Sequence, residues 1–236
     1  MKHAKRHPLI FGTIILTATG LITRVIGFFY RIYLSRLFGE EGMGIYQLLS
    51  PALSLSFSLT AAGYQTAISK YVAADSAKRP SGNLKPLLAG TSITLPLSLV
   101  TNAILFFSAD PIGIFLLKDH RTVPMLRILS FSVPFAALHA CINGYFYGKK
   151  KASVPALTQL LEQLARVSCV FLVTGADLAE GRTPSINAAV LGLTVGEIFS
   201  MLIALVCLYI HLYPDSSILS LQNICPSVPV YRDLLG

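Results

Sequence analysis

A stripe of small, polar and cationic residues runs along the first apolar segment of this 236-residue chain. Its members are separated alternately by four and three positions, and they are Thr13, Thr17, Gly20, Arg24, Gly27 and Arg31. This spacing places them on one face of an α-helix. Guanidinium groups on such a face can bind phosphate oxygens bidentately. We therefore interpret the stripe as the wall of a polar cavity for an anionic group.

The two arginines of the stripe differ in depth within the segment, so different roles are open to each. A charge inside a membrane span is costly and usually faces protein or a water-filled cavity. Arg24 lies deep in its segment, which favours a cavity or a pairing partner. Arg31 lies nearer the end, so it either lines the cavity or extends its guanidinium to the membrane surface.

A second polar group lies in the fifth apolar segment and contains Gln159, Glu162, Gln163 and Arg166. Glu162 and Arg166 are four residues apart, so on a helix they can pair with each other. This pair either holds two helices together or belongs to a polar strip that lines a transport pathway, with Glu162 as a proton-coupled carboxylate.

The other polar residues within apolar segments are His139 and Glu197. Glu197 is expected either to take up a proton or to be the partner of Arg24 or Arg127. We interpret His139, the one histidine deep within an apolar segment, as a hydrogen-bonded core residue. Because the remaining histidines lie near segment ends or in loops, the sequence predicts no metal site, and it predicts no cofactor. It contains none of the motifs GxxxxGK[ST], GxSxG or HExxH, so we expect a protein that is not an enzyme.

The composition indicates a helical membrane protein. Hydrophobic residues make up 53% of the chain and charged residues 13%, whereas soluble domains carry about 25% charged residues. A span needs about 20 apolar residues, and we predict six: Leu9–Leu37, Gly44–Ala73, Leu84–Ala109, Thr122–Tyr147, Val154–Gly175 and Ile186–Tyr213. The predicted fold is an all-α polytopic membrane bundle over residues 1–213, followed by a tail at 214–236.

The net charge of +8 is best explained by membrane topology rather than by nucleic-acid binding. Lysine and arginine concentrate at the N-terminus and in alternate connections, at Lys2, Lys5, Arg6, Lys78, Arg79, Lys85 and 149–151. Cytoplasmic loops carry such an excess. We therefore expect a multi-pass protein of the cell membrane with both termini in the cytoplasm.

Two stretches of the sequence resemble a known family. The first runs from Gly20 to Arg31 and on through Ser35–Leu48, resuming at Ala67–Lys70. The second includes Gly144–Gly148 and Gln159–Arg166. Together they resemble the stage V sporulation protein B family, in the polysaccharide exporter branch of the multidrug, oligosaccharidyl-lipid and polysaccharide exporter superfamily.

The resemblance implies one helical bundle of a transporter whose fold is similar to that of multidrug and toxin extrusion proteins. It implies a flippase that moves a lipid-linked peptidoglycan or polysaccharide precursor across the membrane, for spore cortex synthesis. It also implies that Arg24 lines the cavity and meets the pyrophosphate of the substrate. Arg31, Glu162, Gln163 and Arg166 match positions of the family pattern, and Glu197 is a further cavity candidate.

Members of that family have a second bundle, so we expect this chain to correspond to the N-terminal lobe, with 214–236 leading toward a second lobe or chain. Two other functions stay open. One is a cation-coupled multidrug exporter of the same superfamily, although the arginines of the first span argue against it. The other is an inactive half-transporter or membrane scaffold.

Overall fold

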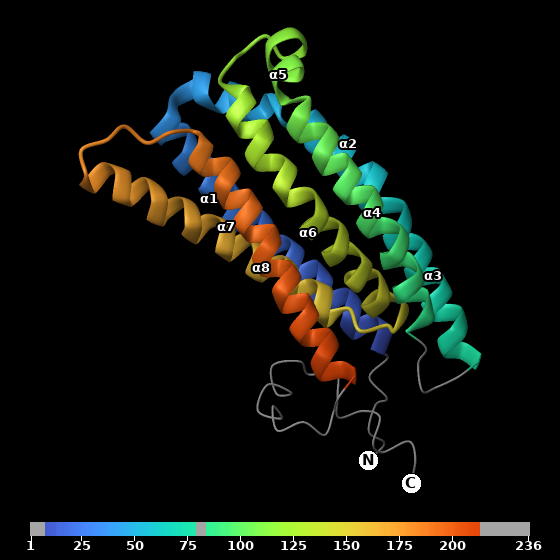
Figure 1. Ribbon diagram of the computed structural model, residues 1–236. Coiled ribbons are helices and arrows are strands. Elements are labelled where there is room, and N and C mark those ends of the chain that lie inside the picture. The colour runs from blue at the N-terminus through green and yellow to red at the C-terminus, as the bar shows by residue number, and fades with distance from the viewer. Residues whose placement is uncertain (1–7, 79–83, 213–236) are drawn as a thin grey trace, which may run out of the picture.

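The computed structural model describes residues 8–78 and 84–212, and within these ranges it contains helices and no strand. The elements are α1 (Pro8–Leu48), α2 (Ser50–Phe57), the π-helix η1 (Ser58–Ala62), α3 (Gly63–Lys78), α4 (Lys85–Phe107), α5 (Ala109–Pro111), the π-helix η2 (Ile112–Leu116), α6 (Thr122–Gly148), α7 (Ser153–Ala179) and α8 (Asn187–Leu212) (Figure 1). The predicted all-α bundle is confirmed.

The described residues contain five helical stretches that are long and apolar enough to cross a membrane. Four of them coincide with α4, α6, α7 and α8, and match the last four predicted spans within a few residues. The fifth stretch covers 65 residues, Gly12–Ser76, and it contains both of the first two predicted spans. At about 1.5 Å per residue, a straight helix of that length would be roughly three times as long as a bilayer core is thick.

The stretch is not one straight helix, because the chain turns at Gly39, whose φ of 69° lies in the left-handed region. That conformation is open to glycine without the steric cost that a Cβ brings. In Figure 1, α1 ascends to the turn, and α2, η1 and α3 descend again. Beyond the turn, the Glu41 carboxylate accepts a hydrogen bond of 2.5 Å from Arg121, which precedes α6. Outside the membrane, the backbone N–H of Arg121 also holds the pKa of Asp119 below its usual range.

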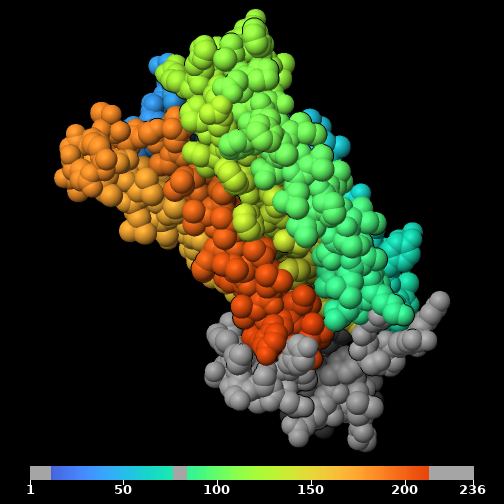
Figure 2. Space-filling model, in the orientation of Figure 1, coloured from blue at the N-terminus to red at the C-terminus, as the bar shows by residue number. Residues whose placement is uncertain are grey.

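Helix α6 is the centre of the bundle. It packs against α3, α4 and α8, while α7 packs on α8 and α1 packs on α7. Its fully buried side chains include Met125, Leu126, Leu129, Tyr145 and Phe146. Figure 2 shows α4 and α8 on one face of the molecule, with α6 visible between them. The outer sides of α4 and α8 expose large apolar side chains such as Ile104, Phe107 and Leu202, as expected of a surface that faces lipid.

Two pairs of glycines let helices approach closely. A Cβ at Gly144 would lie 2.6 Å from the carbonyl oxygen of Gln65, and one at Gly148 would lie 2.7 Å from that of Ser69, so α6 touches α3 backbone to backbone. On α8, Gly192 and Gly196 abut α7 in the same way. Both pairs have the GxxxG spacing that serves helix packing in membranes.

The α3–α6 contact leads to a first prediction. Gly144→Ala should destabilise the protein by about 1–3 kcal/mol, because the added methyl group meets a backbone oxygen that cannot move away easily. Its thermal midpoint in detergent, followed by circular dichroism, should fall by about 2–4 °C per kcal/mol.

The matched control is Gly175→Ala on α7, where a Cβ would meet nothing within 4 Å. Since alanine favours helix over glycine by up to about 1 kcal/mol, this variant should be as stable as the parent or slightly more stable. Equal midpoints for the two variants would contradict the close approach of α3 and α6.

The predicted tail Pro214–Gly236 and the N-terminal basic residues lie outside the described ranges.

Candidate functional site

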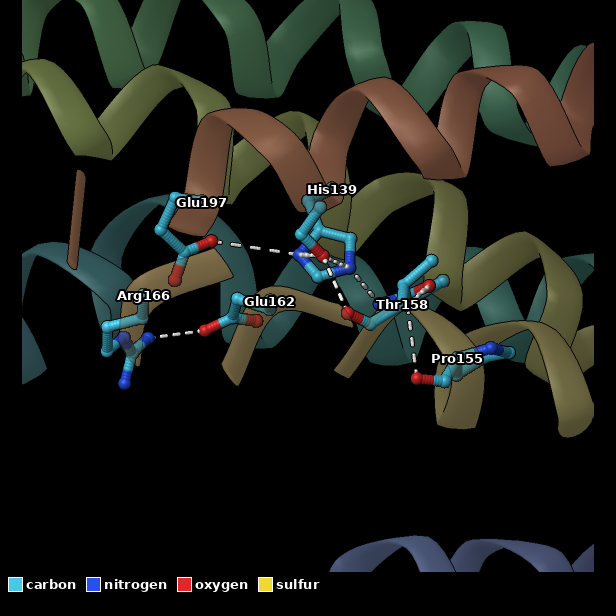
Figure 3. A network of polar contacts seen from close by, with 8 residues as sticks. His139, Pro155, Thr158, Glu162, Arg166 and Glu197 are labelled. Carbon is cyan, nitrogen blue, oxygen red and sulfur yellow. Dashed lines mark hydrogen bonds and ion pairs between the residues drawn. The ribbon is translucent and has the colours of Figure 1, made fainter. Parts of the chain in front are cut away.

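Polar side chains of α6, α7 and α8 meet inside the bundle (Figure 3). We call this group the buried polar cluster, and it comprises His139 and Asn143 of α6, Thr158, Glu162 and Arg166 of α7, and Glu197 and Ser200 of α8. Each helix contributes residues three or four positions apart, so one face of each helix supplies them. The cluster forms because these three polar faces turn toward one another and away from lipid.

Glu162 and Arg166 form an ion pair, as their spacing predicts. Nη2 of Arg166 donates to Oε1 of Glu162 at 2.5 Å. Both side chains are largely buried, with 17% and 20% of their surfaces exposed. Nε of Arg166 is buried and has no hydrogen-bond partner. The guanidinium therefore has unused donor capacity beside the carboxylates.

The partner of Glu197 differs from both that we expected. Its Oε2 lies 3.7 Å from Nδ1 of His139, and Arg127 instead donates to Asp110 at 2.6 Å. Arg24 lies on α1, which contacts the bundle chiefly through α7. Of the two alternatives for Glu197, pairing with Arg127 or Arg24 is not found among the described residues, because sequence alone does not show which helices become neighbours.

Hydrogen bonds hold the imidazole of His139 in place. Its Nε2 lies 2.8 Å from Nδ2 of Asn143 and 2.9 Å from Oγ of Ser200. The single hydroxyl proton of Ser200 has two acceptors in reach, Nε2 of His139 and the carbonyl of Thr158 on α7. With the amide of Asn143 donating to Nε2, the imidazole proton sits on Nδ1 and points toward Glu197. The prediction that His139 is a hydrogen-bonded core residue is confirmed, since it is 8% exposed.

The helices also bring together three groups with lone pairs or charge. One nitrogen of His139 and one oxygen each of Glu162 and Glu197 all lie within 4.8 Å of one another. We expected no group of metal ligands, because the other histidines lie near segment ends or in loops. With a neutral imidazole, the two carboxylates and one guanidinium leave the cluster with one negative charge. Such a site can hold one more positive charge.

The arginines of α1 lie elsewhere. The side chains of Arg24 and Arg31 are exposed, and within residues 8–78 and 84–212 neither forms an ion pair. The stripe approaches the bundle at Gly27, where an added Cβ would lie 3.6 Å from Nε2 of Gln163 on α7. The structure therefore brings Gln163 to the edge of the stripe, while the neighbouring Glu162 packs beside Gly196 of α8.

Sequence reasoning missed Asn143, Thr158 and Ser200 as members of a site. A signal was present, because Asn143 lies four residues after His139, Thr158 four before Glu162, and Ser200 three after Glu197. Polar residues at helical spacing within apolar spans indicate a shared buried face. Only the packing shows that the three faces meet.

The helices and the buried polar cluster define a polytopic helical membrane protein with charged side chains inside its bundle. Residues 9–230 match the family described as polysaccharide biosynthesis protein, and the chain belongs to that family. It is 36% identical over 197 residues to the stage V sporulation protein B of Bacillus subtilis, covering 83% of this chain and 38% of the relative. The predicted family resemblance is confirmed.

Two further relatives from the same organism are more distant. The lipid II flippase MurJ is 27% identical over 179 residues, covering 72% of this chain and 32% of that protein. The sporulation protein YkvU is 25% identical over 162 residues, covering 68% and 35%. The chain thus spans about a third of the length of these relatives. No solved structure matches it.

The ion pair gives the second prediction. Arg166→Gln should destabilise the protein by about 1–3 kcal/mol, because it leaves Glu162 without its charged donor inside the bundle. Adding Glu162→Gln to that variant should restore part of the loss, since the remaining polar groups carry less net charge.

Thermal midpoints of the parent, the two single variants and the double variant form the required cycle. If the effects of the two single substitutions add without a coupling term, Glu162 and Arg166 do not interact.

Proposed function

We propose that this chain is the N-terminal lobe of a flippase that moves a lipid-linked peptidoglycan or polysaccharide precursor across the cell membrane. Its lobe would comprise residues 1–213, with 214–236 leading to a second lobe or chain that completes the transporter. Two relatives support this proposal by name, one a sporulation protein and one a lipid II flippase. The proposed process is spore cortex synthesis, and the protein acts as a transporter rather than as an enzyme.

The arrangement of the α1 arginines is the observation that carries the proposal. Arg24 and Arg31 are exposed on α1, and no described carboxylate pairs with them. A guanidinium in that position would be costly against hydrocarbon. A second lobe opposite α1 would enclose it in a cavity, where the pyrophosphate of a lipid-linked sugar would supply the missing negative charge.

A cation-coupled drug exporter is less compatible with this arrangement. Such a protein would need acidic groups where its cationic substrate binds. The carboxylates Glu162 and Glu197 lie in the buried polar cluster, already beside Arg166 and His139. The exposed face of α1 offers arginines instead.

Replacing Arg24 tests the proposed cavity. Arg24→Ala should lower the flipping rate about 10- to 100-fold, because charge-assisted hydrogen bonds contribute about 1.5–3 kcal/mol. In sporulating cells that lack the gene and carry this variant, lipid-linked precursor should accumulate as it does without any copy. Arg24→Lys should retain part of the activity, since lysine keeps the charge but loses the bidentate geometry.

The control is Arg182→Ala. Arg182 is an exposed arginine in the connection between α7 and α8, and it pairs with Asp177 and Glu180. It should behave as the parent. Precursor levels that do not change when the gene is deleted would overturn the proposed function. Normal levels with Arg24→Ala would overturn the role of Arg24 alone.

We propose further that both termini are cytoplasmic. The end of the bundle that carries the α3–α4 and α6–α7 connections has Lys85, Lys149, Lys150 and Lys151. The opposite end has Glu41, Asp110, Asp119 and Glu180 close to its arginines. Lysine-rich ends stay in the cytoplasm.

Single cysteines test this orientation in a chain whose four native cysteines have been replaced. A membrane-impermeant maleimide should label Glu180→Cys in intact cells. It should label Lys150→Cys only after the membrane is permeabilised. Both positions are exposed in the structure, so access rather than burial decides the result. The reverse pattern would mean that the bundle is inserted the other way round.

A further inference from the structure

We propose that the buried polar cluster is a binding site for one exchangeable proton, shared by the carboxylates of Glu162 and Glu197. Arg166 and His139 are its fixed partners. In the unloaded state the cluster has one negative charge, and in the loaded state a proton from water has joined a carboxylate oxygen and the cluster is neutral. The location of the site rests on geometry alone, whereas its use in transport rests on the proposed function.

The first argument is the balance of charge. Glu162 pairs with Arg166 at 2.5 Å, so this carboxylate has its counter-charge. Among the described residues, the one ion-pair contact of Glu197 is with the imidazole of His139, at 3.7 Å. An uncompensated charge in a poorly polar interior is unfavourable by several kcal/mol. Uptake of one positive charge removes this penalty, and because the carboxylate oxygens lie within 4.8 Å of the same imidazole nitrogen, either can receive it.

The second argument selects a proton over a metal ion. A divalent cation beside Arg166 would turn one excess negative charge into one excess positive charge. A sodium ion would balance the charge, but hard cations prefer oxygen ligands, and one of the three converging atoms is an imidazole nitrogen. Oε1 of Glu162 is also occupied by the guanidinium. A proton needs one oxygen and no coordination shell.

A small recess beside Glu197 has room for a water molecule. A cavity of about 40 Å³ adjoins Glu197, and its lining includes Ser56, Thr60 and Ser132. The hydroxyls of these residues donate to backbone carbonyls, so their lone pairs remain available to accept from water. The volume exceeds what one water molecule requires. Thr60 belongs to the π-helix η1, and π-helical turns often occur at functional sites.

Other titratable groups near the cluster do not change this balance. Helix α1 packs on α7 and places Tyr30 in the electrostatic neighbourhood of Arg166, and α7 itself adds Cys169 nearby. Tyrosine and cysteine side chains are uncharged near neutral pH in their ordinary state. On α2 and η1, the groups that face Glu197 are hydroxyls and apolar side chains.

Proton binding at this site would act on helix packing. A Cβ at Gly196 would lie 3.1 Å from the carbonyl oxygen of Glu162 and 3.3 Å from Cβ of Arg166. The two residues of the ion pair therefore also form a close contact between α7 and α8. Gln163, next to Glu162, reaches the α1 stripe at Gly27. Helix α7 thus carries residues of the cluster and also contacts the face of α1 whose arginines are proposed to hold the substrate.

The test uses the full chain in lipid nanodiscs and needs no substrate. Infrared difference spectra are recorded as the pH is stepped across neutrality, and the C=O stretch of a protonated carboxyl is followed. The parent should show one such carboxyl per chain. Glu197→Gln should lose it, because the cluster is then neutral without a proton. Arg166→Gln should show about twice the signal, because two negative charges then need two protons.

Glu162→Gln also makes the cluster neutral without a proton, so this variant should lose the band as well. It keeps the test decisive if Arg166→Gln does not fold. Glu180→Gln, on an exposed connection, should leave the band unchanged. A band that persists in both Glu162→Gln and Glu197→Gln would overturn the proposal. Loss of the band on addition of sodium ions at constant pH would overturn it in favour of a sodium site. Precursor accumulation is measured separately, so failure of the proposed function leaves this readout intact.

Discussion

The structure depends on how charged groups are kept away from hydrocarbon. In a bilayer an unpaired charge is costly, so each one must meet a partner, a cavity or the interface. Glu162 and Arg166 pair with each other, and Glu197 approaches His139, where α6, α7 and α8 join. This requirement sets the rotation of the three helices about their axes, because any other rotation would turn at least one of these groups toward lipid.

The glycines of α8 make this arrangement possible. Gly192 and Gly196 remove side chains at the positions where Val170, Arg166 and Glu162 approach. The resulting contact brings the carboxylates of α7 and α8 close enough to share one imidazole. Packing without a hydrophobic driving force relies on such close contact and on polar groups between helices. Here both contributions fall on the same two turns of α8.

The positions of the helices along the chain could be predicted from the sequence, but which helices pack against one another could not. Apolar runs of about 20 residues have one explanation in a chain with this composition, so the last four spans could be predicted within a few residues. The Glu162–Arg166 pair could also be predicted, because its spacing is local to one helix. The partner of Glu197 could not, since His139 lies 58 positions earlier on another helix. The turn at Gly39 was placed correctly between two spans, but its left-handed backbone is visible only in the structure.

The buried polar cluster and the α1 stripe each have unbalanced charge, and the two charges have opposite signs. The buried polar cluster has one negative charge more than its partners balance, whereas the α1 stripe has positive charges that no described carboxylate balances. A cation satisfies the first group and an anion satisfies the second. Helix α7 contacts the α1 stripe through Gln163 and contacts α8 through Glu162, so the same helix borders both groups. The proposed proton site and the proposed anion site therefore lie against two contacts of the same helix, α7.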